Sequence, residues 1–409
     1  MGGLSWFGSG LKHYYEGIWY SYQSSGLKSN NVSCAVFDNY SSIYAIHYPT
    51  QTYNFKIVSY KKSTEDWQYL SDTLVDSYFA VADNNNNIWF GHWSLNSGLS
   101  RYNPQNNEWQ IKTWNGFRGV IGALGIDNND TKWTYNQYNT IIALDSAGAE
   151  MEFSIPGLSR PEQPGYEFAF DQDNRVWLGF SGGLVMIDYN NTLFNVSDDN
   201  YQIYPFQEIT SVAIDANNQI WCASTEGILK LENNSLYIFD TTRVKRVKCD
   251  DWGNVWFLTI NTLLRYNIYT KQWKPYTQEN CKIIPNIDND DKFYRWLYID
   301  KNNGCLLIAT KEGISQFNYS VSVSESLSQI RIYPNPFIVK EHQIMTFDNL
   351  PQNSKIKIYS IEGKFIIELA VNKNFGGVRW QPKNLYSGIF LAVIKTDKKT
   401  QIAKFAVIR

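Results

Sequence analysis

A unit of about 44 residues repeats along most of the chain, and a repeat of this length constrains the fold more than any other feature. Each copy has an apolar segment that ends in Asp, a turn rich in Asn, Asp and Gly, and a second apolar segment, and all copies but the last have a large aromatic six residues after the Asp. The recurring acids are Asp38, Asp83, Asp127, Asp171, Asp215, Asp250 and Asp300. The residues six positions later are Tyr44, Trp89, Trp133, Trp177, Trp221, Trp256 and Leu306. This constant spacing predicts a hairpin in every copy.

Two more apolar segments complete most copies, so that each copy predicts four short antiparallel strands, which is one blade of a β-propeller. The Trp rings are expected to fill the space between blades. Seven copies contain the strand that ends in Asp, which predicts seven blades. The segment "LSWFGSGLKHYYEGIWYSY" precedes them and the last copy has no clear fourth strand, so pairing of the two ends would close the ring. Eight blades, with upstream residues missing from the chain, is the alternative.

The repeated frame, as in "AIDANNQIWCASTEGILKL", resembles the two-component-regulator propeller repeat over about residues 4–319. Repeats of this family occur in the periplasmic sensor halves of hybrid histidine kinases and in secreted proteins. The resemblance therefore implies an all-β propeller fold. It leaves the function open, because propellers carry many activities.

The pattern changes after residue 319. We predict a propeller over residues 1–319, a Ser-rich linker over 320–329 and a small immunoglobulin-like β-sandwich over 330–409. From Val321 onward there are 13 Lys and Arg against 6 Asp and Glu, although the whole chain has a net charge of -2. A change of charge at one point favours two domains.

The C-terminal segment contains "IRIYPNPF", a hairpin with Gly363 in its turn, and a final "KFAVIR". It resembles the type A C-terminal sorting domain of the Por, or type IX, secretion system. The matching positions include Tyr333, Pro334, Asn335, Pro336, Phe337, Gly363, Lys364 and Gly388. The resemblance implies export to the cell surface or the medium, with the secretion machinery as a partner. An FlgD-type immunoglobulin-like domain is the alternative. The N-terminus does not have the pattern of a signal peptide, and we expect that this is because the start of the chain is truncated.

Aromatic and polar residues in the loops after the second strands are the candidates for ligand binding, because flat rings fit sugar C–H faces and Arg donates two parallel hydrogen bonds. These candidates are His47, Tyr48, Tyr53, His92, Trp93, Arg118, Tyr135 and Tyr138. They are expected on the face opposite the Asp turns. His47 and His92 are too few for a zinc site, which needs at least three protein ligands.

The sequence contains no catalytic or cofactor motif that we recognise, and the turns such as "DNNNN" do not have the Gly and distal Glu of a helix-loop-helix calcium site. We expect no metal or cofactor, no nucleic-acid partner, no membrane-spanning segment and a monomer. The favoured function is a non-catalytic surface propeller that binds a glycan or a protein. A secreted glycan-degrading lyase or hydrolase, with Arg, His and carboxylates in one pocket, and a ligand-sensing propeller are the alternatives.

Overall fold

The computed structural model describes residues 11–15, 18–22, 32–47, 56–61, 66–71, 77–93, 98–112, 120–161, 165–277, 279, 296–300, 304–310, 313–319, 330–342, 344–351, 354–371, 377–382, 384–396 and 399–409. The protein is all-β, as the repeat predicts. Among these residues no helix is long and apolar enough to cross a bilayer.

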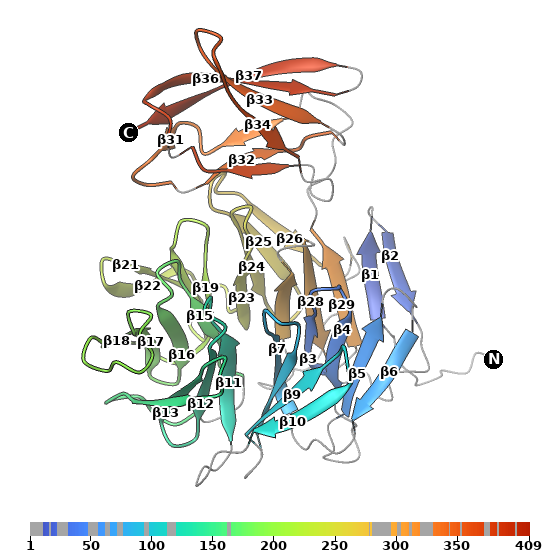
Figure 1. The fold of residues 1–409 in the computed structure, drawn as a ribbon, viewed down its shortest axis with the longest axis vertical. Helices are drawn as coiled ribbons and strands as arrows, with labels where there is room; N and C mark the ends of the chain where they lie inside the picture. The colour runs from blue at the N-terminus through green and yellow to red at the C-terminus, as the bar shows by residue number, and fades with distance from the viewer. Residues whose placement is uncertain are drawn as a thin grey trace, which may run out of the picture.

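Six sheets of four antiparallel strands follow one another along the chain (Figure 1). The first three contain β3 (Val32–Phe37), β4 (Ile43–His47), β5 (Lys56–Lys61) and β6 (Asp66–Ser71); β7 (Ser77–Ala82), β8 (Ile88–His92), β9 (Leu99–Asn103) and β10 (Glu108–Lys112); and β11 (Ile121–Ile126), β12 (Lys132–Asn136), β13 (Thr140–Leu144) and β14 (Glu150–Ser154). The next three contain β15 (Phe168–Phe170), β16 (Val176–Phe180), β17 (Gly183–Asp188) and β18 (Asn200–Pro205); β19 (Ile209–Ile214), β20 (Ile220–Ser224), β21 (Ile228–Glu232) and β22 (Ser235–Asp240); and β23 (Arg246–Cys249), β24 (Asn254–Leu258), β25 (Leu263–Asn267) and β26 (Trp273–Tyr276).

A further sheet joins the two ends of this region. It contains β27 (Trp296–Asp300), β28 (Cys305–Thr310) and β29 (Gly313–Asn318), to which β1 (Leu11–Tyr15) and β2 (Ile18–Tyr22) are added. Strand β1 pairs with β29 in parallel, and β2 pairs with β1. Segments from the beginning and the end of the repeat region therefore share one sheet, which leaves no open edge between them.

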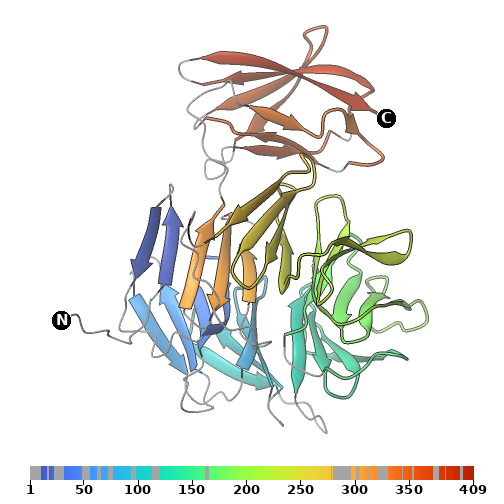
Figure 2. The same cartoon turned by 180° about the vertical axis from the view of Figure 1, so that it is seen from behind.

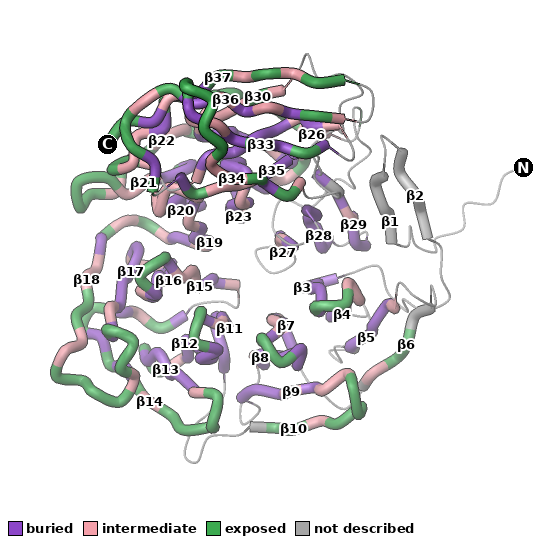
Figure 3. The backbone as a smooth tube through the Cα atoms, turned by 45° about the horizontal axis from the view of Figure 1, so that its top comes forward, coloured by how far each residue is buried: buried purple, intermediate pink, exposed green. Residues whose placement is uncertain are grey.

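The first strand of each sheet lies at the centre of a ring (Figure 3). Strands β3, β7, β11, β15, β19, β23 and β27 contact one another in this order, and β27 contacts β3. The Asp turns follow these inner strands, so all of them lie on one face of the ring, which we name the Asp-turn face. The second strands begin with aromatic residues that are almost completely buried, including Trp133, Trp221 and Trp256.

A separate C-terminal unit has two sheets that share one core. One sheet has β30 (Arg331–Tyr333), β32 (Met345–Asp348) and β35 (Val378–Trp380), and the other has β31 (Phe337–Ile338), β37 (Thr400–Ile408), β36 (Gly388–Lys395), β33 (Lys355–Ser360) and β34 (Phe365–Ala370). Phe347 of the first sheet packs on Phe405 of the second. Figures 1 and 2 show this unit against the ring, beside the sheet of β23–β26.

Candidate functional site

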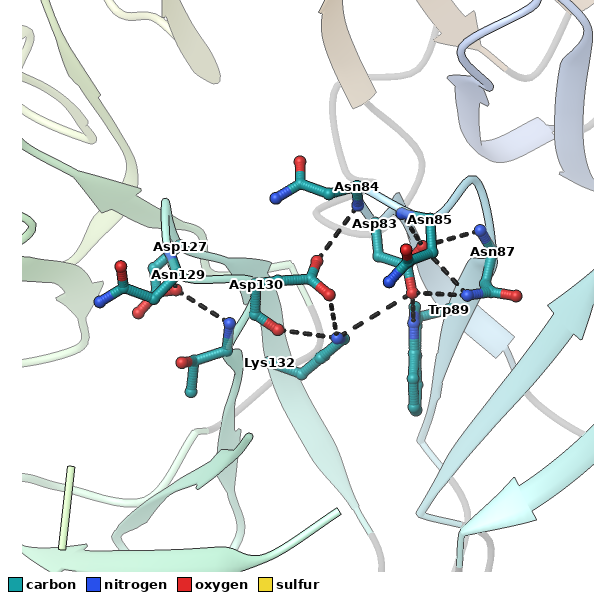
Figure 4. A network of polar contacts seen from close by, with 10 residues as sticks. Asp83, Asn84, Asn85, Asn87, Trp89, Asp127, Asn129, Asp130 and Lys132 are labelled. Carbon is teal, nitrogen blue, oxygen red and sulfur yellow. Dashed lines mark hydrogen bonds and ion pairs between the residues drawn. The ribbon is translucent and has the colours of Figure 1, made fainter. Parts of the chain in front are cut away.

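The Asp of each repeat organises its turn through both carboxylate oxygens. In the turn after β7, Asp83 Oδ1 accepts hydrogen bonds from the backbone of Asn85 and Asn87, and Asp83 Oδ2 accepts one from the indole N–H of Trp89 at 2.8 Å (Figure 4). The same indole-to-carboxylate bond occurs in four more copies at 2.8–3.0 Å. The six-residue spacing between Asp and Trp is therefore the spacing at which one side chain can bond the other across the hairpin.

Neighbouring turns are also bonded to one another around the Asp-turn face. The residue after each Asp donates its backbone N–H to a side-chain oxygen in the next turn, at 2.7–3.3 Å in four successive pairs. The accepting residues have positive φ, which Asn and Asp tolerate better than other side chains. They are Asn86, Asp130, Asn174 and Asn218. The acidic and amide residues of these turns thus have a structural role.

A polar recess of about 280 Å³ lies on the Asp-turn face between the sheets of β7–β10 and β11–β14. Its wall includes Lys132, which occupies a position where the other copies have an aliphatic residue or Cys. Lys132 Nζ lies 2.9 Å from the carboxylate of Asp130 and 3.9 Å from that of Asp83 (Figure 4). All three side chains are buried, so this is an ion network that links two adjacent sheets.

The structure corrects the expected loop position of three candidate ligand residues. His47, His92 and Tyr135 lie in the second strands β4, β8 and β12 and are almost fully buried. His92 contacts Ser77 Oγ through Nδ1 and Ser100 Oγ through Nε2, at 2.8 and 2.7 Å. The prediction of a loop was wrong because β4, β8 and β12 all extend to the ninth residue after the Asp. These side chains lie within the sheets, between neighbouring strands, and not in loops.

Two of the remaining candidate residues, Trp93 and Tyr138, are described by the structure and follow the second strands of neighbouring sheets. Trp93 is half-buried and forms a bridge to Val120, whereas Tyr138 lies in a turn and is 52% exposed. Tyr48, Tyr53 and Arg118 lie outside the described residues. The described part of the chain contains no group of three or more His, Cys, Asp or Glu side chains that could hold a metal ion.

A different group of polar side chains converges at the centre of the ring, on the face opposite the Asp turns. It consists of Glu167, Ser211, Arg246, Lys248 and Trp296, which we name the central cluster. Arg246 and Trp296 begin β23 and β27, and Glu167 is the residue before β15. Ser211 and Lys248 are the third residues of β19 and β23. Because inner strands end at the Asp turns, their beginnings lie at the other face, where we expect the ligand.

The geometry of the central cluster is that of a buried charge network. Lys248 Nζ lies 3.1 Å from Glu167 Oε1, Ser211 Oγ donates to Glu167 Oε2, and Arg246 Nε lies 3.9 Å from Glu167. The Trp296 ring lies 5.7 Å from the Arg246 guanidinium, a distance that permits a cation–π interaction. Glu167 and Arg246 are 2% and 4% exposed, and Arg246 Nε has no hydrogen-bond partner among the described residues.

Burial sets the electrostatics of this cluster. It lowers the pKa of the Arg246 guanidinium, and the carboxylates of Glu167 and Glu208 oppose that shift. It raises the pKa of the neighbouring Cys34 thiol, which is therefore not a thiolate nucleophile at neutral pH. Glu208 accepts a hydrogen bond from the Tyr166 hydroxyl at 3.2 Å beside the cluster.

Sequence reasoning missed the central cluster because its members come from four different repeats. The available signal was a charged residue at the start of a strand that faces the ring centre. In "EFAF" and "RVKC" such residues stand where other copies have Ser or apolar residues. Glu167, Ser211, Arg246 and Trp296 all lie four residues before the Asp of their copies, and this shared position could have identified the cluster.

The residues of the predicted sorting motif come together in the C-terminal unit. Asn335 accepts a hydrogen bond from the backbone of Ala406, and Phe337 is buried beside Val407. Gly363 has a φ of 86° in the turn that begins at Ser360, which glycine adopts without strain. Thus the entry motif "YPNPF" is held against the last strand of the chain.

Residues 331–408 match the family model of the secretion system C-terminal sorting domain. The resemblance to that domain is therefore confirmed, and the tail implies secretion through the type IX system. No protein among the curated ones matches the sequence.

Solved structures share the fold at low sequence identity. PorZ, a surface component of the type IX secretion system of Porphyromonas gingivalis, aligns at a TM-score of 0.59 with 16% identity, over 96% of this chain and 62% of PorZ. The extracellular domain of a hybrid two-component system of B. thetaiotaomicron aligns at 0.54 with 15% identity, over 94% and 56%. The WD40 repeats of RRP9 align at 0.50 with 8% identity, over 68% and 86%. The chain therefore has a β-propeller-like fold, and it spans under two thirds of the first two proteins.

Proposed function

We propose that the chain is a seven-bladed propeller, exported by its sorting domain to the cell surface or the medium, where it binds a glycan or a protein at the central cluster. In this proposal residues 1–319 form the propeller, 320–329 the linker and 330–409 an immunoglobulin-like sandwich. Seven blades are supported by the closed order of contacts among the inner strands and by the pairing of β1 with β29.

The observation that carries the ligand site is the buried central cluster. Burying charges costs free energy, and a network of ion pairs is seldom more stable than an apolar core of the same volume. The inner strands β3, β7, β11 and β19 contain no charged side chain, so the charges at Glu167, Arg246 and Lys248 favour recognition of a polar ligand. Lys248, whose side chain is 20% exposed, offers an ammonium group to the ligand, and Trp296 supplies an aromatic ring 5.9 Å from that ammonium.

A glycan-degrading activity is the second candidate, because the cluster joins a carboxylate with two cations. Glu167 would be its acid or base and Lys248 and Arg246 would stabilise negative charge. No His belongs to the described cluster, which is why binding is preferred. Release of reducing ends from the glycans that bind would show that the chain degrades them.

A glycan array probed with the purified full-length chain tests the proposal. We expect Lys248→Met and Glu167→Gln to weaken binding about tenfold or more if they contact the ligand. Lys132→Met is the matched control, since it removes a buried ammonium on the opposite face and should leave binding unchanged. Equal losses for Lys132→Met and Lys248→Met would refute the site, and an array without any bound glycan would refute the glycan as ligand.

A further inference from the structure

One face of the sorting domain is covered by the propeller. Arg379 on β35 forms an ion pair with Asp251 at 2.8 Å, and the Tyr333 hydroxyl lies 3.5 Å from the carbonyl oxygen of Trp252. Gly377 packs so closely on the Trp252 ring that an added Cβ would lie 2.7 Å from it. The sheet of β30, β32 and β35 is therefore the near side of the domain.

Two turns of the propeller take part in this contact, the Asp turn after β23 and the turn after β25, where the Tyr269 ring lies 5.0 Å from that of Tyr333. Trp252 stands two residues after its Asp, where the other copies have Tyr40, Asn85, Asn129, Asp173 and Asn217. Tyr40 is 70% exposed, whereas Trp252 is 5% exposed under the sorting domain. The buried Trp252 ring adds apolar area to the contact.

The opposite sheet presents an apolar face away from the propeller. Along β36, Phe390, Ala392 and Ile394 point into the core, so the alternate residues point outward. Ile389 and, on the neighbouring β37, Ile402 are 51% and 59% exposed. The outward row continues through Val393, which pairs with Ile402, and through Leu391 and Tyr359, which pair with each other.

Basic side chains surround this apolar row. Lys355, Lys357, Lys395 and Lys404 are exposed on the same outward face. The acidic residue that the structure places opposite them is Glu368, which lies 3.5 Å from Lys357. The face therefore has an apolar centre and a positively charged edge. A contiguous exposed apolar row of this kind is unusual on a domain without a partner.

We propose that this outward face of β33, β34, β36 and β37 is the surface by which the secretion machinery binds the sorting domain, and that the receptor presents an apolar patch edged by carboxylates. The proposal rests on export by the tail, as in the proposed function. Two observations support the choice of this face. The propeller covers the near side of the domain, so the outward face is the one open to a receptor, and its four lysines favour a receptor that presents carboxylates.

Export of the full-length chain tests this surface. The chain is expressed behind a signal peptide in a bacterium that has the type IX system, and its amounts in the periplasm and in the medium plus cell surface are compared. Ile389→Lys with Ile402→Lys should lower export about tenfold or more, because each substitution places a charge in the apolar centre of the interface, where it would be desolvated. Lys395→Glu with Lys404→Glu should also lower it, because the electrostatic attraction is reversed.

Controls separate this surface from folding and from the proposed function. Ile111→Lys, at a 62% exposed propeller position, should be exported normally, and the thermal midpoint of each variant reports folding. Should the double Lys variant melt early, Ile402→Thr, which retains a β-branched side chain, replaces it. Normal export of folded face variants, while a chain without the tail stays in the periplasm, would overturn the surface and leave the proposed function intact. The proposal would also be overturned if the face paired two copies of the chain. The chain would then be a dimer in gel filtration, and Ile402→Lys would dissociate the dimer without loss of export.

Discussion

Replacing Trp221 tests the idea that each Asp–Trp pair stabilises its part of the ring. Trp221 is 1% exposed, its ring packs on Phe239 and Tyr266, and its indole N–H donates to Asp215 at 2.8 Å. Trp221→Ala should reduce the free energy of unfolding by about 3–5 kcal/mol through lost burial and the cavity left behind. Trp221→Phe retains an aromatic ring and loses the hydrogen bond to a buried carboxylate, so its cost should be about 1.5–3 kcal/mol.

The cost of Trp221→Phe should depend on pH. Burial raises the pKa of Asp215, and the Trp221 N–H is the largest of the influences that lower it. A carboxyl with a raised folded pKa contributes stability that is present below its unfolded pKa and is lost as the pH rises through the folded pKa. Without the indole N–H the folded pKa rises further, so the variant should lose more stability at pH 7 than at pH 4.

Urea unfolding followed by far-UV circular dichroism at both pH values measures these effects. Ile111→Ala, at a 62% exposed position, is the control and should change stability by less than about 0.5 kcal/mol. Equal midpoints for the wild type, Trp221→Ala and Trp221→Phe would refute the packing argument. A cost of Trp221→Phe that does not change with pH would refute the role assigned to its N–H.

Three other substitutions address the ring and its contact with the sorting domain. Lys132→Met should cost about 3–5 kcal/mol because it leaves the buried carboxylates of Asp130 and Asp83 without their cation, and Asp130→Ala should cost about as much because Lys132 then has only the more distant Asp83; unchanged thermal and urea midpoints would contradict both. Asn218→Ala should cost about 1–3 kcal/mol, because Ala is strained at the positive φ of 63° and the hydrogen bond from the Gln172 backbone is lost. Asn218→Gly should cost less, because glycine adopts this φ without strain, and equal losses of stability in urea would contradict this. Asp251→Arg or Arg379→Asp alone should lower stability by about 0.2–1 kcal/mol, because the pair is half-exposed. The double variant, which exchanges the two residues, should recover that stability, and a double variant no more stable than the single ones would argue against the contact.

The constant distance from Asp to aromatic predicted the hairpins and the all-β fold from sequence, because it reports a local bond within one turn. Likewise, the change in charge and the "YPNPF" motif predicted the sorting domain, since both are contiguous in sequence. Pairing of the N-terminal segment with the last repeat was also anticipated, and β1 and β29 pair, although in parallel.

The ligand site was harder to predict, because its members are neighbours only after the ring has closed. Glu167 and Lys248 are far apart in sequence, and their 3.1 Å contact depends on the positions of β15 and β23. The misplacement of His47 and His92 has a simpler cause. Strands β4 and β8 extend one residue further than predicted, so both His side chains lie at buried positions in the sheet and not in loops.

Loss of export on removal of the tail is the measurement that tests the central claim most directly. The complete chain and a chain that ends at Tyr319 are expressed behind the same signal peptide in a bacterium with the type IX system, and each is quantified in the periplasm and outside the cell. The account predicts that the complete chain reaches the cell surface or the medium and that the shortened chain stays in the periplasm with an unchanged propeller melting transition. Equal export of two folded chains would contradict it, because the C-terminal domain would then have no role in sorting.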